Sequence, residues 1–339
     1  MCVFQRFALV LFVACFSALP AFGADRVESG YEAVNEPLGF YENQLVIREK
    51  ELAENPADRT ALLRLLALYK DRGIWEAGMT LIDPEIERNP NDQILTGLLV
   101  DMHILEIKDA NIFQKIGAGK DMRDTCLAML ERAPDNAAAL LCLTRFYFLA
   151  PGIAGGNNRK GRVYLDRLEA IDRAVFHRAE AEKFAYDEEW TAAANSFVKS
   201  IETTADNKVL VEAGMYHALR EEWEVAFDYL RRSFAVDPDY RFAQYQMGRF
   251  SALSGKNLKE GEAALIRLLN RPSWYMGVDL RPDAHLHLAE IYRYMGKLPQ
   301  ARKAILRALE LDPKYRAAKR ALKDLDKRAR LFGNSVGKS

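Results

Sequence analysis

A proline recurs where helical patterns end along this chain, and the spacing of these prolines limits the fold more than any other feature. They follow Asn, Ala or Asp in five dipeptides, Asn55-Pro56, Asn89-Pro90, Ala133-Pro134, Asp237-Pro238 and Asp312-Pro313. Pro56 and Pro90 are 34 residues apart, and Pro134 and Pro238 are 104 apart, close to three times 34. Proline ends a helix because it lacks the backbone donor and clashes with the preceding turn. A period of this length predicts a stack of similar helical units.

The clearest unit runs from Pro282 to Pro313. Its apolar residues three and four apart form one buried stripe on each of two helices, and Gly296 permits the tight turn between them. Along the chain the residues concerned are Leu288, Ala289, Tyr292, Gly296, Ala301, Ile305, Ala308 and Pro313. These residues resemble the tetratricopeptide repeat family, which implies antiparallel helix pairs stacked into a right-handed superhelix.

The same register fits six further units. Residues 59–90 match it, and 174–205 and 207–238 align with each other at an offset of 33, pairing Trp190 with Trp223. Units 93–134, 136–172 and 241–277 are longer, with extra residues around 110–120, in the loop 151–158, and near Gly255 and Pro272. Insertions of this kind often carry function. We predict an all-α, right-handed superhelical solenoid of about seven such pairs over residues 59–313, without a strand long enough for an α/β core.

The ends of the solenoid have their own patterns. In the N-terminal segment 24–58, one helix is expected over residues 38–53. Residues 314–339 form a basic capping helix and tail with nine Lys or Arg against Asp324 and Asp326. A solvated cap face explains these charges; the sharper interpretation is peripheral contact with an anionic partner, such as a membrane surface of the cell envelope.

Residues 1–23 have the pattern of a cleavable signal peptide. Arg6 precedes an apolar run from Phe7 to Leu19, and small residues lead to a cut expected after Gly23. The run is shorter than the about 20 residues that span a bilayer. An uncleaved anchor and a lipoprotein acylated at Cys15 are the alternatives. We expect a periplasmic or secreted location and no transmembrane span in the mature chain.

Charge and cysteines exclude several classes of protein. The 48 basic and 48 acidic residues balance, so no basic field is available to hold nucleic acid. After signal removal only Cys126 and Cys142 remain, on core-facing positions of neighbouring predicted helices. A single disulfide between them and two buried thiols are both compatible with the sequence.

No constellation of residues indicates catalysis, a metal or a cofactor. The glycine-rich loop 152–161 lacks a preceding strand and the Gly-Lys-Ser/Thr ending of a phosphate-binding loop. The five histidines are scattered, and no pair has the i, i+4 spacing of two ligands on one helix. We therefore predict a protein that is not an enzyme.

The resemblance also implies a binding groove. In the family, fixed positions of the first helix of each pair line the concave face. In this sequence they are Arg178, Glu182, Tyr186, Val211, Met215, Phe242, Tyr245, Arg249, Glu290, Arg293 and Tyr294. Aromatic, Met and Arg side chains are typical of surfaces that bind polypeptides. The alternative is that some of them pack inside the solenoid. The family's carboxylate clamp is not supported, because Leu63, Ala67, Leu286 and Glu290 occupy its positions.

We therefore predict a non-enzymatic scaffold or adaptor that binds a protein or peptide partner in the bacterial periplasm or envelope. A weaker resemblance, carried by the glycine-rich loop, is to periplasmic repeat proteins associated with solute transporters of the TRAP type. It gives the alternative function of a small-ligand-binding accessory component of such a transporter.

Overall fold

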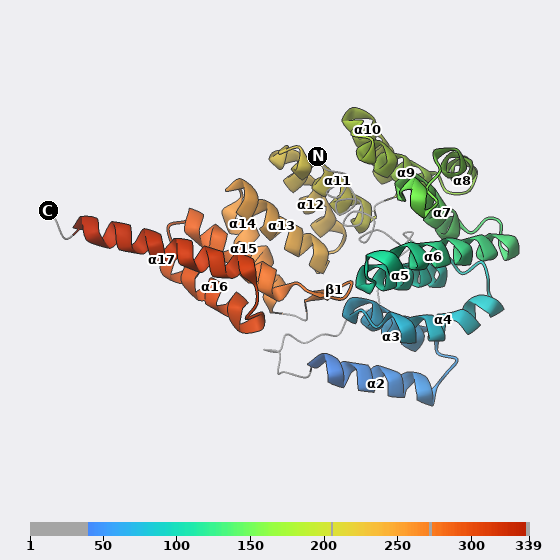
Figure 1. Cartoon of the computed structure of the whole chain (residues 1–339), viewed down its shortest axis with the longest axis horizontal. Coiled ribbons are helices and arrows are strands. Elements are labelled where there is room, and N and C mark those ends of the chain that lie inside the picture. Colours follow the sequence, from blue (N-terminus) through green and yellow to red (C-terminus); the bar gives the residue numbers. More distant parts are fainter. Residues whose placement is uncertain (1–39, 205, 271–272, 337–339) are drawn as a thin grey trace. The chain divides into compact units, whose positions relative to one another are not determined.

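The computed structural model describes residues 40–336 apart from 205, 271 and 272, so the signal sequence lies outside the described residues. The described chain is an α-helical solenoid of antiparallel helix pairs followed by a single long helix, which confirms the predicted fold class (Figure 1). It divides into two compact units. Unit 1 comprises residues 40–213 with 276–278, and unit 2 comprises 214–275 with the chain from Asp279 onward.

Unit 1 begins with a single helix, α2 (Phe40–Glu54). Four pairs follow: α3 (Arg59–Arg72) with α4 (Trp75–Arg88), α5 (Gln93–Asp109) with α6 (Ile112–Arg132), α7 (Ala137–Leu149) with α8 (Asn158–Ile171), and α9 (Arg173–Tyr186) with α10 (Trp190–Thr203). The first part of α11 (Asn207–Leu219) completes this unit.

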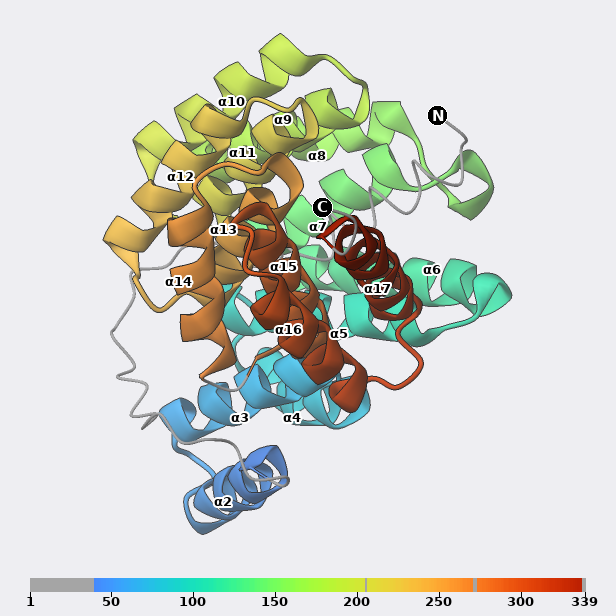
Figure 2. The same ribbon diagram turned by 90° about the vertical axis from the view of Figure 1, so that its left-hand side faces the viewer.

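Unit 2 contains the rest of α11, its partner α12 (Trp223–Val236), and the pairs α13 (Arg241–Ser254) with α14 (Leu258–Leu269) and α15 (Arg281–Tyr294) with α16 (Leu298–Leu311). The last helix is α17 (Arg316–Val336). Figure 2 shows α15 and α16 side by side, as the members of a pair.

The repeated prolines and polar caps explain where the helices stop and start. Each of the five prolines lies two residues beyond the end of a helix, at α2, α4, α6, α12 and α16. The first helices of four pairs begin after a side chain that accepts hydrogen bonds from their free N–H groups. These caps are Asp58, Asp92, Asn136 and Asp172. Such a cap contributes about 1 kcal/mol to a helix.

Two of the predicted insertions have a defined structure. The extra residues after Ala110 lengthen α6 to 21 residues instead of forming a loop, because Asn111 and Gln114 form a capping box that starts the helix there. Within 151–158 the chain makes a short 3-10 turn, η1 (Gly152–Ala154). A side chain at Gly156 would meet the Ala150 carbonyl at 1.8 Å, so only glycine fits this turn.

The insertion after Pro272 forms a small β-hairpin, which the sequence pattern did not predict. Its strands, β1 (Trp274–Tyr275) and β2 (Val278–Asp279), have two residues each. The tip, residues 276–278, belongs to unit 1: the Gly277 N–H donates to the Asp71 carbonyl at 2.8 Å, and Lys108 Nζ donates to the Met276 carbonyl at 2.8 Å. Two-residue strands give too little period-two alternation to recognise in a sequence.

Candidate functional site

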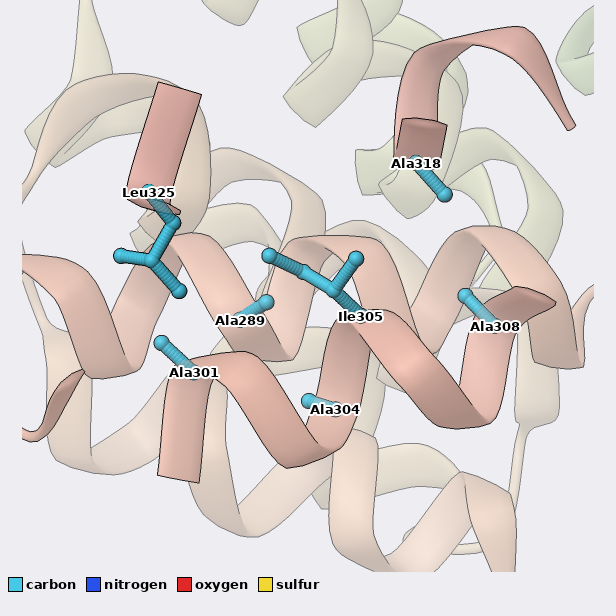
Figure 3. Close-up of a cluster of buried hydrophobic side chains, with 7 residues drawn as sticks. All are labelled: Ala289, Ala301, Ala304, Ile305, Ala308, Ala318 and Leu325. Atoms are coloured by element: carbon cyan, nitrogen blue, oxygen red, sulfur yellow. The ribbon is translucent and has the colours of Figure 1, made fainter. Parts of the chain in front are cut away.

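Unit 2 contains a groove of about 680 Å³, here called the C-terminal groove, lined by α13, α15, α16 and α17. Its floor is made of small and branched apolar side chains that are buried: Ala289, Ala301, Ile305 and Leu325. Figure 3 shows Leu325 of α17 and Ile305 of α16 within the same cluster of buried side chains. This volume is within the range of about 300–1,000 Å³ that ligand sites occupy.

The groove is present because of the way α17 packs. Neighbouring first helices such as α13 and α15 pack directly against each other, whereas α17 packs along α16 and makes few backbone contacts with α15 in the described chain. Ala317 and Ala321 lie on the α17 side of the groove and Ala289 lies on the α15 side. Alanine fills little of the space between the helices, so that space remains as a groove.

Two large apolar side chains in the wall of the groove are open to solvent. Leu253 at the end of α13 is 54% exposed, and Tyr294 at the end of α15 is 45% exposed. Exposing large apolar side chains to water is unfavourable, so exposed apolar residues that line a groove mark a candidate docking surface.

Charged residues stand on both sides of the C-terminal groove. On α15, Arg293 forms a two-point ion pair with Glu290, and its guanidinium lies over the Tyr294 ring, 4.6 Å from the centroid. On α17, Arg320 and Asp324 are exposed and one helical turn apart, and neither makes an ion pair or hydrogen bond with another described residue. The α17 side therefore has a cation and an anion available to a ligand.

A half-buried carboxylate beside the groove ties together three elements of unit 2. Asp283 of α15 accepts hydrogen bonds from the hydroxyls of Tyr245 in α13 and Tyr315, the residue before α17. His287 Nε2 lies 3.1 Å from Asp283 Oδ2, an ion-pair distance. Burial raises the pKa of Asp283, but the imidazole and the two hydroxyls outweigh it and hold the pKa below its usual value. This cluster fixes the start of α17 relative to α13 and α15.

Three of the side chains selected from the sequence meet in the C-terminal groove: Glu290, Arg293 and Tyr294. Tyr245 belongs to the Asp283 cluster, and Arg249 is half-buried with its guanidinium donating to Gln246 Oε1 at 3.2 Å. The other selected positions of α9–α13 pack at least partly inside the solenoid. Phe242, Val211 and Met215 are buried, and Tyr186 is half-buried.

The remaining two selected residues, Arg178 and Glu182, belong to a network of charges from the first helices of unit 1. We call it the unit 1 ion network, and its members are Lys70, Asp101, Arg145, Arg178, Glu182, Lys208 and Glu212. Arg178 is 1% exposed and binds Glu212 through two nitrogens, at 2.9 and 2.5 Å. Arg145 binds Glu182 in the same two-point manner, at 2.7 and 2.5 Å.

Burial alters the proton affinities in this network. It raises the pKa of Asp101, which is paired with Lys70 at 3.5 Å, and also that of Glu212. Lys208 is half-buried, and its ammonium makes no ion pair with a described residue. Burial and the charges of Lys70 and Arg178 lower the pKa of Lys208 to about 7, although Asp101 acts in the opposite direction.

Sequence reasoning missed α17 as a wall of the groove, because its amphipathic pattern is also that of a cap. Leu253 was missed as well, since it does not lie at a family position used to select groove residues. Leu286 does lie at such a position, matching Arg178, but was not selected. Ala317 and Ala321, four apart on an otherwise charged helix, were the available signal.

Within residues 40–336, the gaps at 205, 271 and 272 aside, no three His, Cys, Asp or Glu side chains converge to hold a metal ion. None of the helices resolved there combines the length and apolarity needed to span a bilayer.

The sequence itself carries the family signature in the unit that forms the α15 and α16 walls. Residues 282–315 match the family model described as tetratricopeptide repeat. The unit formed by α15 and α16 is therefore a tetratricopeptide repeat. Proteins with this repeat are interaction scaffolds that bind protein or peptide partners. No curated protein sequence matches the chain significantly.

One solved structure shares the fold at low sequence identity, and two others are similar with lower scores. A monomeric mutant of IFIT1 with Gppp-AAAA superposes with a TM-score of 0.53 at 12% identity, covering 87% of this chain and 70% of that one. The Cut9-Hcn1 hetero-tetramer of APC/C gives 0.49 at 13% identity and 84% coverage; this chain spans about half of the matched one, 52%. YrrB, a TPR protein with an unusual peptide-binding site, gives 0.43 at 16% identity, covering 58% of this chain and 97% of that one.

Proposed function

We propose that this protein is a non-enzymatic scaffold that binds a polypeptide partner in its C-terminal groove. The observation that carries the proposal is the pair of exposed apolar side chains, Leu253 and Tyr294, in a groove whose buried floor is apolar. Large apolar side chains of a partner that pack onto such a floor supply most of the affinity of an interface, and a charged rim adds selectivity.

We further propose that the scaffold works in the periplasm or elsewhere in the bacterial cell envelope. The signal-like pattern of residues 1–23 supports this location. So does the disulfide between Cys126 of α6 and Cys142 of α7, whose Cα atoms are 6.7 Å apart, because disulfides persist mainly in oxidising compartments. The exposed Arg316, Lys319 and Lys323 of α17 offer an additional peripheral contact with anionic envelope surfaces.

The alternative, a small-ligand-binding component of a solute transporter, would be favoured by an enclosed apolar cavity. The C-terminal groove instead has walls that are half exposed at Leu253 and Tyr294. An open groove suits a long ligand that continues beyond it at both ends, so a polypeptide is the better supported occupant.

Site-specific photo-crosslinking in the native host tests the proposal. A photoreactive residue replaces Tyr294 in the groove, and the matched control carries it at Leu306, which is exposed on α16 but does not line the groove. We expect a discrete polypeptide adduct from position 294 and none from 306. Equal labelling at both positions, or no polypeptide adduct at 294, would contradict groove binding.

The location has its own test. N-terminal sequencing of the protein from fractionated cells should give a chain that begins at Ala24 in the envelope fraction. A full-length chain in the cytoplasm would disprove export.

A further inference from the structure

Apart from the charges at its rim, the C-terminal groove offers a ligand few hydrogen-bonding groups. Its walls are helices, whose backbone N–H and C=O groups are paired within α13, α15, α16 and α17 except in the terminal turns. Glu290 and Arg293 bind each other, and His287 lies against Asp283. An extended peptide laid on this floor would leave its own backbone groups unpaired, at about 1–3 kcal/mol for each one buried.

A helix carries its backbone hydrogen bonds with it and avoids this penalty. We propose that the occupant of the C-terminal groove is an amphipathic helix of the partner, lying between α15 and α17 over α16. This inference rests on the proposed function and specifies the form of the polypeptide. The partner helix would occupy the space that α17 leaves open by packing mainly along α16.

The spacing of small residues suits a helical ligand. Ala317 and Ala321 are one turn apart on α17, and Leu286 and Ala289 lie on the facing side of α15. Ridges of large side chains on one helix pack into such gaps on another. The groove-lining part of α17, residues 317–325, is about 12 Å long, at 1.5 Å per residue. A partner would therefore present apolar anchors at i, i+4 and i+7.

The rim charges set the polar flank of the partner helix. Arg320 and Asp324 are exposed, one turn apart, and without a partner among the described residues. A helix with a carboxylate opposite Arg320 and an ammonium opposite Asp324 complements both. The i, i+4 spacing of these two rim residues is one that another helix reproduces directly.

The test uses the full mature chain and designed 18-residue peptides in a fluorescence anisotropy titration. The helical probe has leucines at i, i+4, i+7 and i+11 and one Glu and one Lys a turn apart on one flank, in both charge orders. The control probe has the same leucines and charges, with two central residues changed to proline to break the helix. We expect one charge order of the helical probe to bind at least tenfold more tightly than the proline probe.

Variants of the chain locate the binding. Ala321→Trp fills the groove and should weaken binding at least tenfold, and Leu253→Asp, at an exposed wall position, should do the same without touching the core. Arg320→Glu should weaken it about threefold, the effect of an exposed ion pair, and a probe with Lys in place of its Glu should restore it. Lys303→Glu, exposed on α16 outside the groove, is the matched control and should change nothing.

The outcomes separate this inference from the proposed function. If the proline probe binds as tightly as the helical one, or no helical probe binds, the helical occupant is disproved, while polypeptide adducts at position 294 would leave the proposed function standing. Binding that Ala321→Trp and Leu253→Asp do not change would also overturn the inference. The absence of both probe binding and adducts would overturn both proposals.

Discussion

Charged residues on the first helices of the repeats are placed differently in the two units. In unit 1, Glu182 is 6% exposed and paired with Arg145 of the preceding first helix; at the matching repeat position in unit 2, Glu290 is half-buried at the groove rim and paired within its own helix. Arg178 in unit 1 is likewise matched by the groove-lining Leu286 in unit 2.

The difference teaches what each set of residues can do. The charges that are ion-paired between successive helices, as in Arg145–Glu182 and Arg178–Glu212, hold the helices in register and are not available to a ligand. The apolar floor and charged rim of the C-terminal groove link the helices less strongly, but they are available to bind a ligand. The same repeat pattern therefore gives helices joined by ion pairs in unit 1 and an open groove in unit 2.

Removing the central cation of the unit 1 ion network should produce the largest effect. Arg178→Met leaves the Glu212 carboxylate buried without its cation, while Glu182 keeps Arg145. Breaking a buried pair in this way costs about 3–5 kcal/mol of unfolding free energy. Urea unfolding followed by circular dichroism measures the loss. Arg64→Ala, at an exposed position of α3, is the matched control and should change stability by less than about 0.5 kcal/mol.

A double variant sharpens the interpretation of that loss. Arg178→Met with Glu212→Leu removes both charges of the tightest pair and should recover part of the stability. A double variant as unstable as the sum of the two single ones would show that the pair does not couple the two helices.

The corresponding change in unit 2 should be smaller. Tyr245→Phe removes one of the two hydroxyls that bind Asp283 and retains the ring, so we expect a loss of about 1.5–3 kcal/mol, the range for a hydrogen bond to a charged group. Because Asp283 also holds Tyr315 before α17, probe binding to the C-terminal groove should weaken together with stability. Tyr294→Phe, an exposed tyrosine on α15, is the control and should leave stability unchanged. Equal losses from the two variants would exclude a special role for the Asp283 cluster.

The repeat architecture could be predicted from sequence because its signals are local. Prolines, caps and apolar stripes act within one or two turns, and each of the five prolines lies two residues after a helix. The groove could be predicted only in part, since Glu290, Arg293 and Tyr294 follow from a repeat position, whereas the placement of α17 on α16 depends on packing between elements.

The same limit explains the selected residues that lie in the interior. Arg178 and Tyr245 are large polar side chains at groove positions, and whether they bind a ligand or a neighbouring helix depends on which partner the next repeat supplies. Glu212 and Asp283 supply it here, from repeats 34 and 38 residues further along the chain. A single-helix pattern does not contain that information.

The smallest expected effect concerns Lys208, the cation of the unit 1 ion network that has no ion-pair partner. Its pKa is about 7 in the folded chain and about 10.4 in an unfolded one. Between these values the unfolded chain binds a proton that the folded chain lacks, so unfolding free energy should rise with pH from 7 toward 10, by at most about 1.4 kcal/mol per pH unit. Below pH 7 both states are protonated and the full cost of the buried charge remains.

Lys208→Met removes this cost, and it should therefore be more stable than the original chain at pH 6, by about 1 kcal/mol or more, with the advantage shrinking by pH 9. Lys199→Met, at an exposed position of α10, controls for loss of a charge. If Lys208→Met is more stable by the same amount at pH 6 and pH 9, then Lys208 does not titrate in this range, and burial does not disfavour its charged form.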